Sequence, residues 1–236
     1  MVTMNSLMPA KQQALAYSNS MVGTGYLAYR DLEILIKDYV RGKNVLDYGC
    51  GRGRSSRFLS SLGFEVDAID TCSHMVEQAK KQCKKIRYRP VEAFQANYPA
   101  NSFDFILAQL VLVEIRNKWD LKAMLKEQFE ALKPGGILIH TTVSDDFLKH
   151  SWSTIDTDYP GNEKIKNGQA GRIKLINRNL ELDSFCWQEA FLRSSFKKTG
   201  FEVLILHRPL GHNNDPYQWG SEATESPYFV FVLKRV

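Results

Sequence analysis

Short apolar runs alternate with amphipathic segments along most of this 236-residue chain. Runs of strand length, bounded by Gly, Asn, Asp or Pro, occur at residues 45–48, 64–70, 86–90, 103–109 and 136–143. Segments with apolar residues at helical spacing stand around them, at residues 26–40, 54–62, 73–85 and 119–132. Because a helix between two strands requires a crossover connection, this order predicts a parallel sheet with helices on both faces.

The C-terminal part of the chain departs from this order. Asp183 or Ser184 is a suitable cap for a helix that continues through Lys198, and residues 201–207 and 227–233 follow as two strands. Two strands without a helix between them form an antiparallel pair. The predicted fold is therefore α/β, with a seven-stranded, mostly parallel sheet and an antiparallel last strand.

Nearly forty residues, 144–182, lie between the fifth strand and the predicted last helix. Loops of this length in a compact domain are usually functional or disordered, and the apolar residues here argue for order. Residues 172–176 and 179–182 alternate around a turn at Asn177, which predicts a small β-hairpin. We predict a single domain over residues 1–236, with a helical cap at 1–41 and an insert at 144–182.

Composition excludes some classes of protein. The chain is 44% hydrophobic and 24% charged, and it contains no apolar run of membrane-spanning length. Its first residues lack the pattern of a signal peptide, so we predict a cytoplasmic protein. The four cysteines have no zinc-binding spacing. The net charge of +5 leaves a nucleic-acid partner open, although the densest basic run, at residues 80–89, is typical of a solvated helix face.

One turn carries the strongest chemical signal. Asp47 ends the first strand, and Gly49, Gly51 and Gly53 then alternate with larger residues before a helix begins. Alternating glycines between a strand and a helix allow a ligand to lie on the backbone. The dinucleotide fingerprint spaces its glycines differently, as G-x-G-x-x-G, which disfavours a nicotinamide dehydrogenase. The acid at the start of the turn suits a ligand that carries positive charge.

This turn resembles the first motif of the class I S-adenosylmethionine-dependent methyltransferases. Three further features are similar to that family: Asp70 at the end of the second strand, Glu92-Ala93 after the third, and Leu-Lys-Pro-Gly-Gly at 132–136. The resemblance implies S-adenosylmethionine as cofactor. It implies a cofactor site that comprises Asp47, Gly49, Cys50, Gly51, Asp70, Thr71, Glu92, Ala93 and Gln109. Glu92 stands where the family usually has Asp.

Methyl transfer from a sulfonium requires mainly that the acceptor be held in line with the methyl group. A base is needed when the acceptor starts protonated, and the candidate catalytic residues are Glu114 and His140. Similar enzymes place an N-terminal helix across the mouth of the site, so Tyr29 is a candidate substrate residue. If residues 144–182 form a lid over the acceptor, then Trp152 and Tyr159 are further candidates.

The predicted function is methyl transfer to a small-molecule acceptor, with no metal and no membrane partner. Enzymes of this fold that methylate base amines carry Asn/Asp-Pro-Pro-Tyr/Phe after the fourth strand, whereas this chain has Ala108-Gln109-Leu110-Val111. This disfavours a nucleic-acid base as acceptor. Two alternatives stay open: a methyltransferase that acts on other RNA or protein targets, and a non-catalytic protein that only binds S-adenosylmethionine. The sequence is silent on the oligomeric state.

Overall fold

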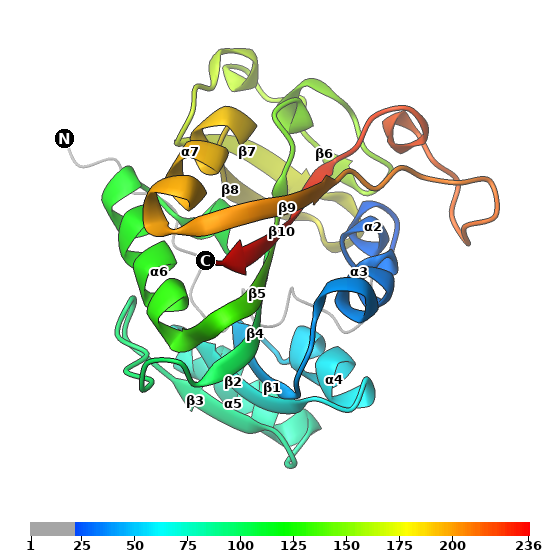
Figure 1. Ribbon diagram of the computed structural model, residues 1–236. Helices are drawn as coiled ribbons and strands as arrows, with labels where there is room; N and C mark the ends of the chain where they lie inside the picture. The colour runs from blue at the N-terminus through cyan, green and yellow to red at the C-terminus, as the bar shows by residue number, and fades with distance from the viewer. Residues whose placement is uncertain (1–21) are drawn as a thin grey trace.

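The computed structural model describes residues 22–236, and its centre is a seven-stranded sheet with the order β3-β2-β1-β4-β5-β10-β9 (Figure 1). Its strands are β1 (Asn44–Tyr48), β2 (Glu65–Asp70), β3 (Arg87–Pro90), β4 (Phe103–Gln109), β5 (Leu132–Val143), β9 (Phe201–His207) and β10 (Tyr228–Arg235). The pairs among the first five strands are parallel, and β10 runs antiparallel to both β5 and β9. The predicted fold class is confirmed, including the antiparallel last strand.

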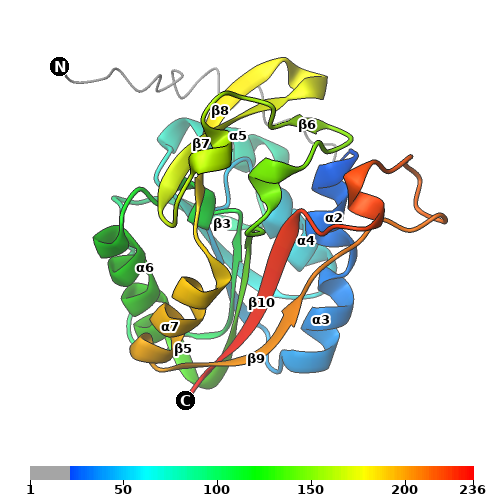
Figure 2. The ribbon, with the colours of Figure 1, turned by 90° about the horizontal axis from the view of Figure 1, so that it is seen from above.

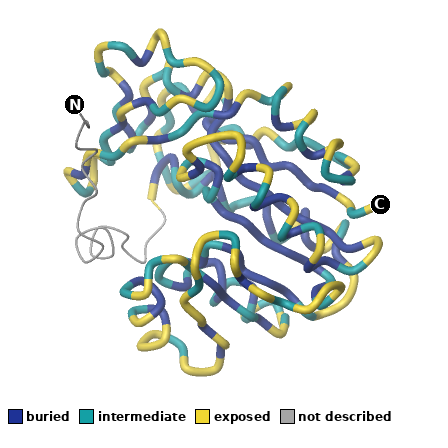
Figure 3. Tube along the Cα trace, turned by 90° about the vertical axis from the view of Figure 1, so that its left-hand side faces the viewer, coloured by how far each residue is buried: buried dark blue, intermediate teal, exposed yellow. Residues whose placement is uncertain are grey.

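Helices cover both faces of this sheet because the strand residues alternate between them. Phe105 and Leu107 of β4 pack on the same side as α3 (Leu32–Tyr39), α4 (Arg54–Ser61) and α5 (Ser73–Gln82). Ile106 and Ala108 pack on the opposite side with α6 (Lys118–Ala131) and α7 (Glu189–Thr199). The buried strands run through the middle of the molecule between exposed helix faces (Figure 3).

The insert forms a second, three-stranded antiparallel sheet at the end of the molecule where β5 finishes (Figure 2). Its strands are β6 (Ile155–Asp156), β7 (Gln169–Leu175) and β8 (Leu180–Cys186), and the short 3-10 helix η4 (Ile176–Arg178) joins the last two. The other 3-10 helices are η1 (Leu112–Glu114), η2 (Phe147–Lys149), η3 (Asn162–Lys164) and η5 (Ser221–Ala223). The predicted hairpin is therefore present, with β6 added at its edge.

Two boundaries differ from the prediction. Asp183 and Ser184 do not cap a helix: they pair with Arg172 and Gly171 in the second sheet, and α7 begins only at Glu189. The insert therefore extends to Cys186. The helix predicted over residues 26–40 is divided at Asp31 into α2 (Thr24–Arg30) and α3. Residues 1–21 of the predicted N-terminal cap lie outside the described residues.

Candidate functional site

The strand order reverses between β1 and β4, because β2 follows β1 on one side and β4 on the other. In open α/β sheets a crevice forms at such a switch point, outside the carboxyl ends of the strands. A pocket of about 460 Å³ lies there, and we call it the turn pocket. Its walls include the glycine turn, the ends of β2 and β4, and Tyr29 of α2.

The glycine turn has the open backbone that a ligand requires. Gly51 has a φ of +51°, and a Cβ added to it would meet no atom within 4 Å, so its outer side faces open space. Gly49 has a φ of +77°, and a Cβ there would come within 2.5 Å of the Val111 side chain. Side chains larger than glycine would strain both positions. The turn thus packs against Val111 in the segment after β4, while its surface at Gly51 is open.

Asp70 fixes the turn from the neighbouring strand. One of its carboxylate oxygens accepts a 2.7 Å hydrogen bond from the Gly51 amide, and the other accepts a 2.8 Å bond from the Cys72 amide. Burial raises the pKa of the Asp70 carboxyl above its usual value, while these backbone donors oppose the shift. Asp70 and Thr71 both line the turn pocket, so this carboxylate connects the turn to the pocket wall.

Asp47 lies beneath the turn rather than on the pocket wall. It is fully buried, and the hydroxyls of Ser55 and Ser56 both donate to its Oδ2 atom. Its Oδ1 atom has no hydrogen-bond partner among residues 22–236. Burial raises the pKa of this carboxyl to about 6. When ionised, this carboxylate places negative charge beneath the turn, which favours a positively charged ligand above it.

Gln109 ends β4 at the edge of the pocket and contacts α2. Its Nε2 atom donates a 3.4 Å hydrogen bond to the carbonyl of Ala28, while its Oε1 atom has no partner in the described part of the chain. Leu110 follows with a φ of +56°, a left-handed backbone that is rare for leucine. Such strained residues concentrate at functional sites, and both residues line the turn pocket.

A second, smaller cavity of about 150 Å³ adjoins the first, and we call it the insert pocket. Arg54, Leu110 and Glu114 line both cavities and form the junction between them. The rest of the insert pocket is mainly apolar. Its apolar lining residues are Val22, Val113, Val143, Phe147, Ile155, Ile173, Leu175, Leu182 and Tyr228.

Glu114 stands at this junction on η1. Its side chain reaches solvent through the open pocket, yet the surrounding protein raises the pKa of its carboxyl. Burial is the largest cause, and the negative charges of Asp70 and Asp183 add to it, whereas Arg116 opposes them. A carboxylate with a raised pKa is a better proton acceptor than a solvated one.

His140, the second catalytic candidate, lies in the core of the protein. Its ring is fully buried between the sheet and α6, its Nε2 atom lies 3.0 Å from Oε1 of Gln128, and it lines neither pocket. Burial lowers the pKa of the imidazole to about 3. We therefore withdraw His140 as a catalytic candidate, because it points to the face of the sheet opposite the helices α3 to α5 and has no path to a ligand.

The other predicted residues divide between the pocket walls and the rest of the molecule. Tyr29, Gly49, Cys50, Gly51, Asp70, Thr71, Ala93 and Gln109 line the turn pocket. Glu92 is exposed and lines neither pocket. Trp152 is a core residue of the insert: its ring lies 5.7 Å from that of Phe147, and its Nε1 atom donates to the Phe147 carbonyl. Tyr159 is half-buried and also lines neither pocket. The wall prediction for Trp152 and Tyr159 is corrected accordingly.

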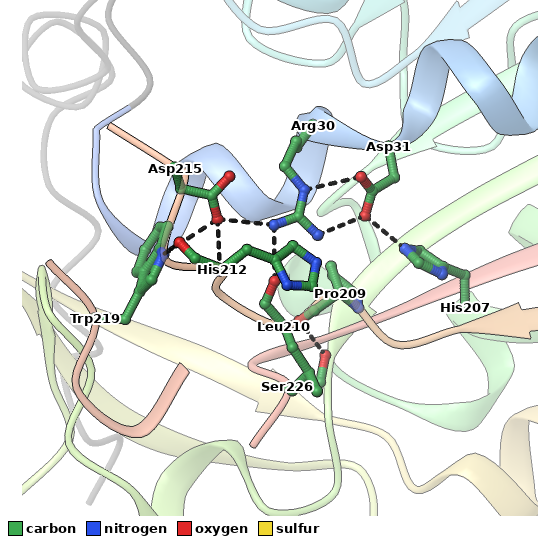
Figure 4. Close-up of polar contacts among 9 residues, drawn as sticks. All are labelled: Arg30, Asp31, His207, Pro209, Leu210, His212, Asp215, Trp219 and Ser226. Atoms are coloured by element: carbon green, nitrogen blue, oxygen red, sulfur yellow. Dashed lines mark hydrogen bonds and ion pairs between the residues drawn. The ribbon is translucent and has the colours of Figure 1, made fainter. Parts of the chain in front are cut away.

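Polar contacts join the C-terminal end of α2 to the loop after β9 (Figure 4). Arg30 forms ion pairs with Asp31 and with Asp215, at 2.8 and 2.9 Å, and donates to the carbonyl of Leu210. Asp31 also accepts from His207, 2.7 Å away, at the end of β9. Burial alone would raise the pKa of the Asp31 carboxyl, but the contacts with His207 and Arg30 outweigh burial and lower this pKa below its usual value. The loop after β9 thus holds the helix that carries Tyr29.

Comparisons with known proteins agree with this architecture. A sequence model described as a methyltransferase domain matches residues 45–136, which include the glycine turn, Asp70 and the end of β4. This segment of the chain is therefore similar to a methyltransferase domain. Within the described residues, no helix is long and apolar enough to cross a membrane.

The chain is also similar to curated proteins that have different names. The chain is 27% identical over 160 residues to malonyl-[acyl-carrier protein] O-methyltransferase of Enterobacter lignolyticus, a match that covers 63% of this chain and 62% of that protein. It is 27% identical over 187 residues to demethylmenaquinone methyltransferase of Tropheryma whipplei, which covers 72% and 74% of the two chains. The chain thus matches less than two thirds of the length of the first of these relatives.

A solved structure is similar over nearly the whole fold. The S-adenosylmethionine-dependent methyltransferase structure from Methanosarcina mazei has a TM-score of 0.66, with 19% identity, and covers 86% of this chain and 97% of its own. Because the sequence identity is only 19%, this similarity shows a shared fold and nothing further.

Proposed function

We propose that this protein transfers a methyl group from S-adenosylmethionine to a small-molecule acceptor. One observation carries the proposal: the turn pocket, built on the Asp47–Gly53 turn and Asp70, opens through Glu114 into an apolar insert pocket. A cofactor with a charged end and an acceptor with an apolar body would meet at this junction. The names of the relatives support the activity, and the sheet topology places the pocket where this fold binds ligands.

The residues of the turn pocket fit S-adenosylmethionine. The open Gly51 surface and the Gln109 side chain on the pocket wall suit the methionine end, which carries an ammonium group and a sulfonium. Asp70 is assigned to the ribose hydroxyls, because it is an acceptor at the end of the adjacent strand. Ala93 and Phe94 line the side assigned to the adenine ring. When bound, this cofactor supplies an electrophilic methyl group on a good leaving group.

The junction residues are assigned to the acceptor. Glu114 accepts a proton from the acceptor if its nucleophilic atom starts protonated. Residues 144–186 wall the acceptor site, with the apolar side chains of β7 and β8 in place of Trp152 and Tyr159. The remainder of the catalytic effect comes from holding the acceptor in line with the methyl group and excluding water.

A macromolecular acceptor is the competing proposal, and the size and lining of the insert pocket favour a small molecule. Methyl-labelled S-adenosylmethionine incubated with a metabolite extract, with RNA and with a protein extract distinguishes these acceptors. We expect label in small molecules together with release of S-adenosylhomocysteine. Label confined to RNA, with activity that falls steeply as salt rises, would support the nucleic-acid alternative. Binding of S-adenosylmethionine without methyl transfer to any of these acceptors would support the alternative of a non-catalytic protein that only binds the cofactor.

A further inference from the structure

The junction between the two pockets brings together groups of opposite charge. Arg54 and Glu114 line both cavities, and Arg178 and Asp183 line the insert pocket. Two guanidinium groups and two carboxylates thus face this cavity, so its walls carry no net charge. A neutral acceptor matches walls without net charge, whereas an ionic acceptor would add an unbalanced charge to the cavity.

The insert pocket also limits the size and polarity of what it holds. Side chains from η1, β5, η2, β10 and the β6-β7-β8 sheet surround it, and two of them are the aromatic rings of Phe147 and Tyr228. Its volume of about 150 Å³ equals that of an engineered apolar cavity that binds benzene. One six-membered ring with small substituents therefore fills the space, and aromatic walls favour an aromatic ring.

Glu114 distinguishes among neutral ring compounds. A hydroxyl must lose its proton as it is methylated, and Glu114 is a carboxylate at the junction of the two cavities, where the proposed function requires the methyl group to be transferred. A phenolic hydroxyl has a pKa of about 10, far closer to that of a carboxyl than the value of about 16 for water-like hydroxyls. Arg54, on the same wall, favours the negative charge that develops on the oxygen.

Resting on the proposed function, we infer that the acceptor is a neutral, single-ring phenol whose hydroxyl lies between Arg54 and Glu114, with its ring in the insert pocket. The phenol oxygen forms a bond to the methyl carbon as the carbon–sulfur bond breaks. The hydroxyl proton passes to the Glu114 carboxylate and then to solvent, and the electron pair of the broken bond stays on sulfur. The sulfonium becomes a neutral thioether, the oxygen becomes a methyl ether, and no oxidant or metal is required.

Binding of simple probes tests this inference without turnover. p-Cresol, benzoate, benzylamine and n-hexanol are titrated into the protein saturated with S-adenosylhomocysteine, with ligand-observed NMR as the readout. We expect p-cresol to bind about tenfold or more tightly than the other three probes. Tighter binding of benzoate or benzylamine would overturn the neutral acceptor, and tighter binding of n-hexanol would overturn the phenolic ring.

Variants that fill the insert pocket supply the second part of the test. Leu175 and Leu182 are half-buried residues of the pocket wall, so Leu175→Trp and Leu182→Trp place an indole ring in the cavity. We expect each to weaken p-cresol binding about tenfold or more while S-adenosylhomocysteine still binds. Ile34→Trp is the matched control, because Ile34 is 62% exposed on α3. Unchanged p-cresol affinity in both filled variants would overturn the inference.

The two proposals fail in different ways. If the wild-type protein does not bind S-adenosylhomocysteine, the proposed function is wrong, and p-cresol titrated alone still reports on the insert pocket. If S-adenosylhomocysteine binds but p-cresol does not, only the assignment of the acceptor is wrong.

Discussion

The hydroxyl of Thr24 donates a 2.6 Å hydrogen bond to the buried carboxylate of Glu222, although 198 residues separate the two in the chain. The same Glu222 oxygen accepts 2.8 Å bonds from the amide and the hydroxyl of Ser153. One carboxylate therefore joins α2, the insert and the loop before β10. Two of these segments, α2 and the insert, line the pockets.

Replacement of Glu222 tests the importance of this connection. Glu222→Ala leaves buried donors on Thr24 and Ser153 without an acceptor, at a cost of about 1–3 kcal/mol for each. We expect a matching fall in the free energy of unfolding, measured by urea denaturation. Glu225→Ala is the control, because Glu225 is an exposed acid of the same loop. Equal stability of the two variants would show that the buried carboxylate does not stabilise the fold.

A pH-dependent stability is expected from Asp47. Burial raises its pKa to about 6, whereas an unfolded Asp has a pKa of about 3.9. Between these values the folded protein binds the proton more tightly than the unfolded chain does, so this group's contribution to stability is lost as pH rises from about 4 to about 6. In urea denaturation, Asp47→Asn should gain stability relative to the wild-type protein across this window. A constant difference between the two proteins would contradict the raised pKa.

The position of the ligands predicts a pattern of hydrogen exchange. S-adenosylhomocysteine alone should slow exchange at residues 49–51 and 70–72, because these amides line the turn pocket. Addition of p-cresol should extend the slowing to β7 and β8, which wall the insert pocket. The exposed end of α5, at residues 80–82, serves as a control that neither ligand should affect. If β7 and β8 do not respond, the insert is a scaffold and not an acceptor wall.

Much of the fold follows from the sequence, because apolar periodicity and glycine turns are local signals. The seven strands and their helices are at the predicted places, within a few residues. The start of the last helix was not predictable in this way. Asp183 and Ser184 are good helix caps, but their pairing with β7 prevails over this local preference.

The site is only partly predictable for a related reason. Most of the residues predicted to bind the cofactor line the turn pocket, because they follow from one turn and three strand ends, where the local pattern and the fold agree. His140 lies on β5, where residues 137–143 are buried on both faces, so no alternation reveals which way a side chain points. Trp152 packs against Phe147 in a small core of the insert, a contact that the local sequence pattern does not reveal. The insert pocket combines side chains from distant segments, and only the tertiary structure brings them together.

The central claim is that the turn pocket binds S-adenosylmethionine, and calorimetric titration of the wild-type protein, Asp70→Ala and Asp67→Ala tests it most directly. Asp67 lies on the same strand as Asp70 but pairs with Arg87 at the surface, outside the turn pocket. We expect one cofactor to bind per chain, with a loss of about 1–3 kcal/mol in Asp70→Ala and no loss in Asp67→Ala. Unchanged affinity in Asp70→Ala, or a wild-type protein that binds NAD and not S-adenosylmethionine, would contradict the account.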